Sequence, residues 1–557
     1  MKALTYHELH RPTLSGERTV KSECLPFTQI PHSTRLFTDF LSYSPKVQKF
    51  YPHSPFFNQW AKDEASQLKY DPERRQSVSS ILERQNRNWG ASGKTLANIS
   101  RLRAGAAAVV TGQQVGLFGG PVFTIFKALT AVKLADQASH DGVDCVPVFW
   151  LATEDHDVAE VNQVAIPGAD YSLQSFNVPT QGLPGAPVGT VRFGSEVEPV
   201  VEAATGLLGP SAIADFLREA YRPGETFGSA FARLFARLFA DWGVILLDAA
   251  DPEFHHIAKP IYHAAIERTS ELNDALLARG RELDAAGYHQ QVKVTPSSTL
   301  LFTLRNGARV PVHRHVSASA DFLIEDEQIS HADLLHRIKS SPEQFSANVL
   351  LRPVIQDYLL STLAYVGGAA EVAYFAQVGV VYEELLGRLT PILPRLSATI
   401  VEQKPKTLLE RYKLSLPDLF LGPEKLRELM ASRTLPQELQ SAFDQADASL
   451  QKSLAAIRES LARLDPTLVD SATNAASKMH HQLTQLRDRA ARAELRHEEI
   501  LARKADLLCN VLYPNKVLQE REIGGAYFIA RHGTEFLRVL YDTIHTDCFD
   551  HQVITLV

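Results

Sequence analysis

The sequence lacks the cysteine density of a chain that is held together by disulfides or zinc. Its 557 residues contain only four cysteines, Cys24, Cys145, Cys509 and Cys548, and no two of them form a CxxC pair. A disulfide framework or a zinc knuckle needs several closely spaced cysteines. We therefore expect neither, and a reducing cytoplasm is the expected compartment.

The sequence also lacks long uninterrupted apolar runs and an excess of positive charge. Residues 104–126 and 358–382 are interrupted by glycine, glutamine, proline or glutamate, so neither is expected to cross a membrane. The N-terminal stretch MKALTYHELHRPTLSGER has no apolar core, which argues against a secretory signal. The net charge of -7 argues against nucleic acid as a partner.

Short buried strands alternate with helices from about residue 101 onward. The run AAVVT precedes a glycine-rich loop, a helix through about Ala138 and the apolar strand CVPVFWLA at 145–152. GVILLD is a further buried strand that ends on Asp248, and Asp251-Pro252 then starts a helix. Strand, helix and strand at this spacing predict a parallel sheet and an α/β fold.

Composition predicts further divisions of the chain. Glycine and proline are frequent between 165 and 224, and alternating strands with an Asn-Gly turn follow residue 292, so we expect two inserts in the core. Residues 423–510 are rich in Ala, Leu, Glu and Arg, which predicts two long antiparallel helices broken at 464–468. The predicted regions are a mostly helical N-terminal region (1–100), the core (101–164, 227–284 and 346–422), two inserts (165–226 and 285–345), a coiled-coil hairpin (423–512) and a C-terminal segment that packs back on the body (513–557).

The stretch TGQQVGLFGGP, residues 111–121, has more glycines than a tight turn needs. Glycine lets a backbone approach an anion closely, and ligands of α/β sheets bind beyond the carboxyl ends of the strands. The pattern matches neither GxGxxG nor GxxxxGK[ST], so a helix-packing turn is the alternative. The candidate ligand-binding residues here are Thr111, Gly112, Gln113, Gln114, Gly116, Gly119, Gly120 and, on the following helix, Lys127.

The acidic stretch TEDHD directly follows the second strand. Three carboxylates and an imidazole suit a general base, or the binding of an ammonium group or a metal, although four adjacent residues cannot all reach one ion. A solvated acidic loop with a capping aspartate is the alternative. The candidate catalytic residues are Glu154, Asp155, His156 and Asp157.

A third polar set lies in two apolar segments, 352–358 and 365–377, that we expect to be buried. Buried polar groups need partners, and either each other or a ligand would serve. Both possibilities stay open. The candidate binding residues of this set are Arg352, Gln356, Asp357, Gly367, Gly368, Glu371, Tyr374 and Gln377.

Other polar residues carry weaker signals. His255-His256 and His313-Arg314-His315 lack the spacing of metal ligands, and we interpret them as surface histidines. The sequence has no GxSxG elbow, and Cys145 is interpreted as a buried strand residue. We predict no metal site, and whether the activity requires a metal is left open.

Four blocks of the sequence together resemble one known family. TGQQVGLFGGP, PVFWLATEDHDVAEVN, LRPVIQDYLLSTLAYVGGAAEVAYFAQ and LYPNKVLQER resemble, in the same order, blocks of the cysteine-adding enzymes of bacillithiol biosynthesis. The resemblance implies a Rossmann-like core, similar to class I aminoacyl-tRNA synthetases and nucleotidylyl transferases. It also implies two inserts and a C-terminal antiparallel coiled coil through which a homodimer forms.

The resemblance further implies a ligase that joins the carboxyl of cysteine to the amine of glucosaminyl-malate. A carboxylate is a poor electrophile, so ATP is the expected cosubstrate, although no His-x-Gly-His signature indicates synthetase-style adenylation. On this interpretation the 111–120 loop binds phosphate or another substrate anion, residues 154–157 hold the amine and accept its proton, and Arg352 holds the malate carboxylates. The candidates for a second nucleotide site are Tyr513, Asn515 and Lys516.

Two other functions stay open at this point. One is an ATP-dependent ligase or nucleotidylyl transferase that acts on another amino acid or sugar. The other is a non-catalytic, nucleotide-binding coiled-coil scaffold. The polar clusters at the strand ends argue against the scaffold, which has no need of them.

Overall fold

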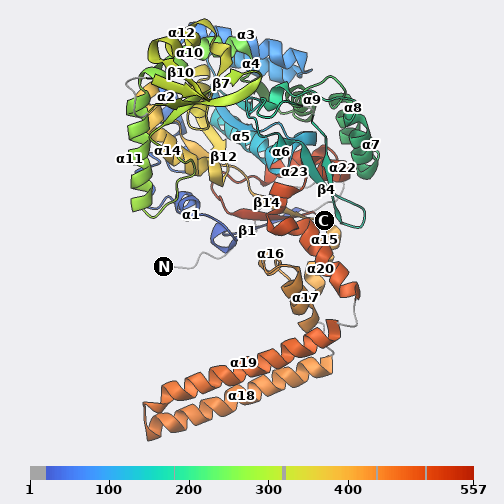
Figure 1. Cartoon of the computed structure of the whole chain (residues 1–557). Helices are drawn as coiled ribbons and strands as arrows, with labels where there is room; N and C mark the ends of the chain where they lie inside the picture. Colours follow the sequence, from blue (N-terminus) through green and yellow to red (C-terminus); the bar gives the residue numbers. More distant parts are fainter. Residues whose placement is uncertain (1–19, 181, 316–320, 434–436, 496–498, 557) are drawn as a thin grey trace. The chain divides into compact units, whose positions relative to one another are not determined.

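A five-stranded parallel sheet forms the centre of the fold (Figure 1). The computed structural model describes residues 20–180, 182–315, 321–433, 437–495 and 499–556, so the expectation about a secretory signal lies outside the described residues. The sheet has the order β13-β12-β2-β3-β6, and every neighbouring pair is parallel, which confirms the predicted α/β fold. Its strands are β2 (Ala107–Gln113), β3 (Cys145–Leu151), β6 (Ile245–Asp248), β12 (Thr362–Gly367) and β13 (Ile392–Pro394).

Both faces of this sheet are buried, which explains why its strands are mainly apolar. Ala108 and Val110 of β2 pack into one core, whereas Ala107 and Val109 pack into another. Helices on both faces leave no exposed side to alternate with polar residues. Helix α5 (Phe123–His140) contributes to the second core; α3 (Pro72–Asn88), α4 (Gly93–Ala104), α10 (Pro252–Glu267), α11 (Thr269–Ala285), α13 (Arg352–Leu359) and α14 (Ala369–Leu386) contribute to the first.

Two amide side chains of α3 close the outer edge of β6. Asn86 donates to the carbonyl of Leu246 (2.7 Å) and accepts from its N–H (3.0 Å). Gln85 donates to the carbonyl of Asp248 (2.9 Å) and accepts from its N–H (3.1 Å). An open strand edge would leave these backbone groups unpaired. The amides therefore complete the sheet and fix the position of Asp248.

The first predicted insert contains helices that its composition did not predict. Besides β4 (Gln163–Pro167) and β5 (Leu173–Asn177), it forms α7 (Val197–Leu208) and α8 (Ala212–Ala220). Both helices bury an apolar face, which the surrounding glycines and prolines obscured in the sequence. Short α6 (Val158–Val161) precedes the insert, and α9 (Phe227–Leu238) follows it.

The second insert forms an antiparallel sheet with the order β10-β9-β8-β7-β11. Strands β7 (Ser298–Arg305) and β8 (Ala308–Arg314) make the predicted hairpin, whose turn is Asn306-Gly307. Both turn residues have positive φ, the conformation that Asn-Gly favours. The other elements are β9 (Asp321–Ile324), β10 (Glu327–Ser330), α12 (His331–Ser340) and β11 (Phe345–Ala347).

The chain divides into two compact units. The first comprises Met1–Gly168, Gln174–Thr399 and Glu520–Gln552, and the second comprises Ala169–Leu173, Ile400–Gln519 and Val553–Val557. Besides the core, the first unit holds α1 (Arg35–Leu41), α2 (Ala61–Gln67), α22 (Gly525–His532), α23 (Glu535–Thr543) and all of α21 (Gln519–Glu522) except its first residue. A three-stranded sheet has the order β1 (Val20–Leu25), β15 (His551–Leu556) and β14 (Ala398–Val401).

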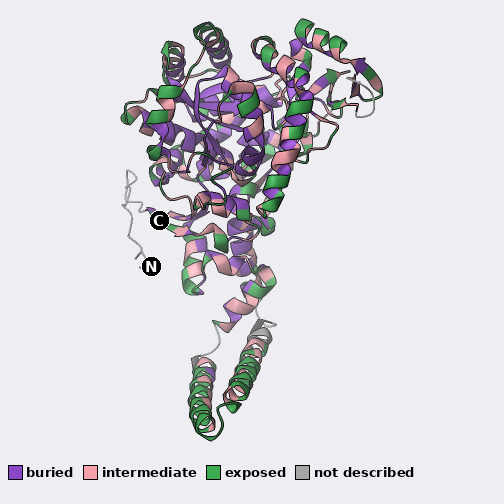
Figure 2. Cartoon of the chain, turned by 90° about the vertical axis from the view of Figure 1, so that its left-hand side faces the viewer, coloured by how far each residue is buried: buried purple, intermediate pink, exposed green. Residues whose placement is uncertain are grey.

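The second unit is helical. Its long helices α18 (Gln437–Leu464) and α19 (Leu468–Leu495) lie side by side and antiparallel, with the predicted break between them (Figure 1). The span predicted as two helices also contains α17 (Pro423–Ser432) and α20 (Glu499–Leu512), so that prediction was incomplete. Short α15 (Gln403–Arg411) and α16 (Leu416–Leu419) precede them. Most of α18 and α19 is exposed, in contrast to the sheet core (Figure 2).

Within the described residues, no helix is both long enough and apolar enough to cross a membrane.

The contacts of Gln85 and Asn86 with the outer edge of β6, here called the amide clamp, can be tested by substitution. Asn86→Ala leaves the N–H and C=O of Leu246 without their side-chain partner, which should lower the free energy of unfolding by about 1–3 kcal/mol. Thermal unfolding should show a lower midpoint for this variant. Asn88→Ala, at an exposed position of the same helix, is the matched control and should leave the midpoint unchanged. Equal effects of the two substitutions would contradict the clamp.

Candidate active site

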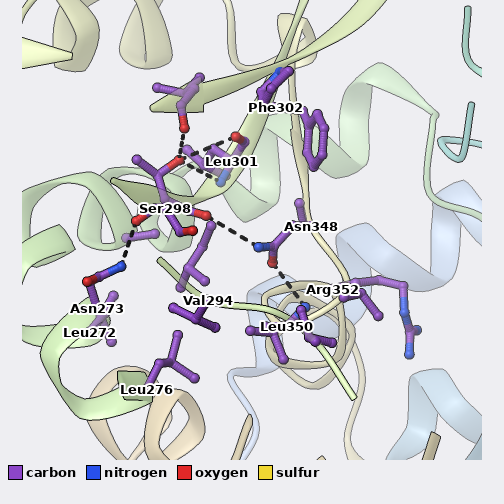
Figure 3. A pocket seen from close by; sticks show the side chains of 18 of the residues that line it. Leu272, Asn273, Leu276, Val294, Ser298, Leu301, Phe302, Asn348, Leu350 and Arg352 are labelled. Carbon is purple, nitrogen blue, oxygen red and sulfur yellow. Dashed lines mark hydrogen bonds between the residues drawn. The ribbon is translucent and has the colours of Figure 1, made fainter. Parts of the chain in front are cut away.

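A cavity of about 480 Å³ lies beyond the carboxyl end of β3 (Figure 3). It is enclosed by the residues that follow β3, by α11, by the β7–β8 hairpin and by residues 347–352, all in the first unit. Its volume is within the range of small-molecule sites, and this edge of a parallel sheet is where ligands of α/β proteins bind.

One side of the cavity is apolar and is held in shape by two amide side chains, buried Asn273 and partly buried Asn348. Asn273 donates to the carbonyls of Thr295 and Ser298, at 2.9 Å each. Asn348 donates to the carbonyl of Thr299 (3.3 Å) and accepts from the N–H groups of Leu350 and Leu351, at 3.0 Å each. These bonds shape the turn that begins α13 and so set the position of Arg352. Figure 3 shows the apolar side chains Leu272, Leu276, Val294, Leu301 and Leu350 around the amides.

Glu154 brings a carboxyl group into this cavity. It follows β3, and its side chain is 17% exposed, with Oε1 3.4 Å from Nε2 of His255. Burial raises the pKa of Glu154 to about 8, although the positive charges of Arg309 and Arg352 favour its ionised form. Glu154 can therefore hold or accept a proton near neutral pH.

The imidazole of His255 lies against the carboxyl group of Glu154. It lies on α10, is buried, and places Nδ1 3.1 Å from the hydroxyl of Tyr262. Burial lowers the pKa of His255 to about 4, so the imidazole is neutral beside the carboxyl. The interpretation of His255 as a surface residue was wrong, because its helical position places it on the buried face with Phe254, Ala258 and Tyr262; His256, one residue on, is exposed.

Arg309 is a cavity residue that sequence analysis missed. Its guanidinium lies 3.9 Å from the centre of the Phe302 ring and donates to Ser346 Oγ (2.9 Å) and to the carbonyl of Ala347. A further nitrogen lies 3.3 Å from Nδ1 of His156. No motif marks an arginine in an insert strand, so only the fold reveals that β8 faces the TEDHD segment.

Arg352 is the second fixed guanidinium of the cavity. It donates to Gln356 Oε1 (3.1 Å) and to the hydroxyl of Tyr374 (3.2 Å), and it lies over the rings of Trp150 and Tyr365. Burial opposes the charge of Arg352, but Tyr365, Tyr374 and Glu371 hold its pKa above the ordinary value. The predicted residues Arg352 and Tyr374 are thus brought together at the cavity.

The other polar residues of the third cluster bond within the protein. Gln377 accepts from the N–H of Val292 and donates to its carbonyl, at 2.8 Å each. Asp357 accepts from Thr390 and from Gln356 (3.1 Å), and burial raises its pKa. The alternative of a structural network accounts for both of these residues.

Some of the TEDHD residues likewise bond within the protein, whereas others line the cavity. Asp155 accepts from the N–H of His156 (2.7 Å) and from Gln114 Nε2 (2.7 Å), and Asp157 caps α6 through the N–H of Glu160 (3.3 Å). Glu154 and Asp155 line the cavity. The geometry therefore favours Glu154 among the four candidate catalytic residues.

The glycines of the 111–120 loop pack against protein. A Cβ on Gly112 would lie 3.0 Å from the carbonyl oxygen of Trp150, and one on Gly116 would lie 3.0 Å from Cα of Gly120. Gly119, at φ +89°, faces Leu234 of α9. Buried Thr111 donates to the carbonyl of Val366 at 2.9 Å. These contacts support the packing-turn alternative for much of the loop.

A second polar centre lies between the carboxyl ends of β2 and β12, where the strand order reverses. Lys127 Nζ contacts Glu371 Oε2 (2.6 Å), the carbonyl of Gly112 (2.8 Å) and Gln113 Oε1 (2.9 Å). Burial lowers the pKa of Lys127 to about 8. Burial opposes the charge of Glu371 too, but Lys127 and the N–H of Gly368 (2.7 Å) hold the pKa of Glu371 below its ordinary value. Gly367 and Gly368 thus border an ion pair.

The candidates for a second nucleotide site belong to the second unit. Tyr513 packs on Phe420, and Asn515 and Lys516 both have positive φ in a short 3₁₀ turn. Within the described residues, no group of three or more His, Cys, Asp or Glu side chains is placed to hold a metal ion.

Comparison with known proteins gives one family for both units. The model of "Bacillithiol biosynthesis BshC, N-terminal Rossmann-like domain" matches residues 20–396, and that of the C-terminal coiled-coil domain matches residues 398–556. A relative from Koribacter versatilis, named "Putative cysteine ligase BshC", is 49% identical and covers 96% of this chain and 99% of its own. A relative of the same name from Solibacter usitatus is 38% identical and covers 96% of this chain and 99% of its own. One from Salinibacter ruber is 32% identical and covers 93% of this chain and 96% of its own.

The raised pKa of Glu154 predicts a pH-dependent effect of Glu154→Gln on stability. Between the ordinary pKa of 4.5 and the folded-state value of about 8, the folded protein keeps a proton that the unfolded chain has lost. The wild type therefore loses stability relative to the variant as pH rises through this window. The unfolding midpoint of the variant minus that of the wild type should increase between pH 5 and pH 8.

The matched control is Glu198→Gln, which removes an exposed carboxylate on α7. This control should give a midpoint difference with much weaker pH dependence. A difference for Glu154→Gln that stays constant with pH would contradict the raised pKa.

Proposed function

This chain belongs to the bacillithiol biosynthesis BshC family, and on that premise we propose that it is a cysteine ligase that forms a carbon–nitrogen bond. The family predicted from four sequence blocks is thereby confirmed. The observation that carries the proposed site is Glu154, a carboxyl with a raised pKa in a cavity that also presents two fixed guanidinium groups.

The substrates that we propose are cysteine and glucosaminyl-malate. Glucosaminyl-malate carries an amine and two carboxylates, and the cavity offers a proton acceptor together with Arg309 and Arg352. Guanidinium groups pair well with carboxylates, and both are already oriented by ring and hydrogen-bond contacts. The cavity of about 480 Å³ is large enough for a small polar metabolite.

Glu154 acts as the general base in this proposal. An ammonium group that enters the cavity stabilises the carboxylate form of Glu154 and lowers its pKa from about 8, so that it can take up the proton of the amine. The neutral amine then attacks the activated carbonyl carbon of cysteine. His255 does not compete for the proton, because its own pKa is about 4.

Activation of the cysteine carboxyl is proposed to use ATP, as an acyl adenylate or an acyl phosphate. The carboxylate attacks the α-phosphorus of ATP and releases pyrophosphate, or attacks the γ-phosphorus and releases ADP. AMP or phosphate, respectively, then leaves as the amide bond forms. The centre between β2 and β12 is the proposed position of the phosphates, because Lys127 and the N-terminus of α14 lie there. Lys127 is engaged by Glu371, so a phosphate has to share or displace that contact.

Purified protein tests this proposal directly. With cysteine, glucosaminyl-malate and ATP, the wild type should form the amide product, detected by mass spectrometry. Glu154→Gln and Arg352→Lys should each lower kcat/KM by about 100-fold or more, because the first removes the base and the second removes the planar guanidinium. The controls are Glu198→Gln and Arg305→Lys, at partly or fully exposed positions outside the cavity lining.

The outcomes separate the proposal from its rivals. Product formation with a different amine or amino acid, but not with these substrates, would favour a related ligase. Absence of ATP-dependent product with any substrate tested would favour a scaffold. Wild-type turnover in Glu154→Gln would exclude this residue as the base.

We also propose that α18 and α19 form a homodimer with a second copy of the chain. Apolar side chains remain exposed along both helices, among them Ile457 (51%), Leu464 (78%), Met479 (48%) and Leu486 (56%). Such side chains on a two-helix hairpin are normally covered by a partner helix.

Light scattering tests the homodimer. The wild type should have twice the mass of one chain, and the double substitution Ile457→Glu with Leu486→Glu should shift it to one. Lys452→Glu, at an exposed polar position of α18, is the control and should remain dimeric. A dimer that survives the double substitution would place the interface elsewhere.

A further inference from the structure

Two cysteines from opposite ends of the chain lie in contact. Sγ of Cys24 and Sγ of Cys548 are 3.4 Å apart, although 524 positions separate them in the sequence. Cys24 is on β1, and Cys548 precedes β15, the neighbour of β1 in the three-stranded sheet. Both are partly exposed, whereas Cys145 and Cys509 are buried.

The surrounding backbone holds this approach in place. Ser22 Oγ donates to Gln552 Oε1 (3.3 Å), and the N–H of Gln552 donates to the carbonyl of Ser397 (2.9 Å). Beside Cys548, the ring of Phe549 packs on Phe56 with centres 5.3 Å apart. The sulfur contact thus lies between anchored segments rather than between two loose side chains.

We propose that Cys24 and Cys548 are a redox-sensitive pair that forms a reversible intramolecular disulfide by exchange with a low-molecular-weight disulfide. This inference is independent of the proposed ligase activity, since neither cysteine lines the cavity. A disulfide bond is about 2 Å long, so the sulfurs have to approach by a little over 1 Å, which side-chain rotation can supply.

The exchange balances in two steps. The thiolate of Cys548 attacks one sulfur of the small disulfide, forms a mixed disulfide and releases one small thiolate. Cys24 then loses its proton, attacks the sulfur of Cys548 and releases the second small thiolate. The two cysteines are oxidised, the small disulfide is reduced to two thiols, and no other reactant is consumed.

The surroundings of the two cysteines determine which one attacks the small disulfide and which one resolves the mixed disulfide. The hydrogen bond from Cys24, aided by the backbone N–H of Asp550, lowers the pKa of Cys548 to about 7, although burial and the charges of Asp547 and Asp550 oppose this. The same contact raises the pKa of Cys24. Cys548 is thus the attacking thiolate and Cys24 the resolving thiol. Burial raises the pKa of Cys145 to about 12 and of Cys509 to about 11, which keeps both unreactive.

Oxidised glutathione is a suitable probe with the full-length protein. After incubation and removal of the probe, thiol titration in denaturant should fall from the four cysteines of the sequence to two. Peptide mapping should find the segment around Cys24 linked to the segment around Cys548, and a reductant should restore all four thiols. The unfolding midpoint of the oxidised protein should rise, because the bond closes a loop of over 500 residues.

Two variants assign the steps. Cys24→Ser should accumulate a stable mixed disulfide with glutathione on Cys548, because the resolving thiol is missing. Cys548→Ser should react at least ten-fold more slowly than the wild type. Four free thiols in the treated wild type would overturn the proposal, and so would a mixed disulfide without the linked peptide. The wild-type result stands by itself if either variant fails to fold.

Discussion

Strands that are buried on both faces can present polar side chains to a ligand only beyond their ends, and this constraint determines where chemistry is possible in the core. Strands β2, β3, β6 and β12 are parallel, so their carboxyl ends share one edge of the sheet. Glu154, Lys127 and Glu371 all lie at that edge. The amides of Gln85 and Asn86 keep it regular, because they satisfy the outer backbone of β6 in place of a further strand.

The same edge gives two buried carboxylates opposite properties. Glu371 touches Lys127 at 2.6 Å and accepts from the N–H of Gly368, so its pKa is lowered in spite of burial. Glu154 has neutral His255 at 3.4 Å instead, and its pKa is raised to about 8. Glu371 therefore stays ionised beside Lys127, while Glu154 can exchange a proton. This separation of pKa values is the pattern expected of a structural ion pair beside an acid–base group.

Local sequence signals predicted the fold better than the detailed site. The strand runs, the Asn306-Gly307 turn and the cap at Asp251 depend on neighbouring residues, and the structure confirms each of them. The TEDHD block predicted a candidate site beyond the end of β3, but its spacing did not distinguish Glu154 from the capping residue Asp157. His255 was misjudged and Arg309 was missed for another reason: His255 contacts Glu154, and Arg309 reaches the cavity, through tertiary packing between segments that lie far apart in the sequence.

The glycine-rich loop lies next to the candidate site for a reason other than its glycines. Its glycines allow close packing against Trp150 and α9, so their number is explained without any ligand. What ties the loop to the site is a polar residue, Gln114, which donates to Asp155 (2.7 Å) and to Glu160 (2.6 Å). Both acceptors belong to the segment that carries Glu154, so the loop helps to orient that segment. The physical argument for ligand binding therefore rests on the cavity and on its charged groups, and the loop contributes by holding one wall in place.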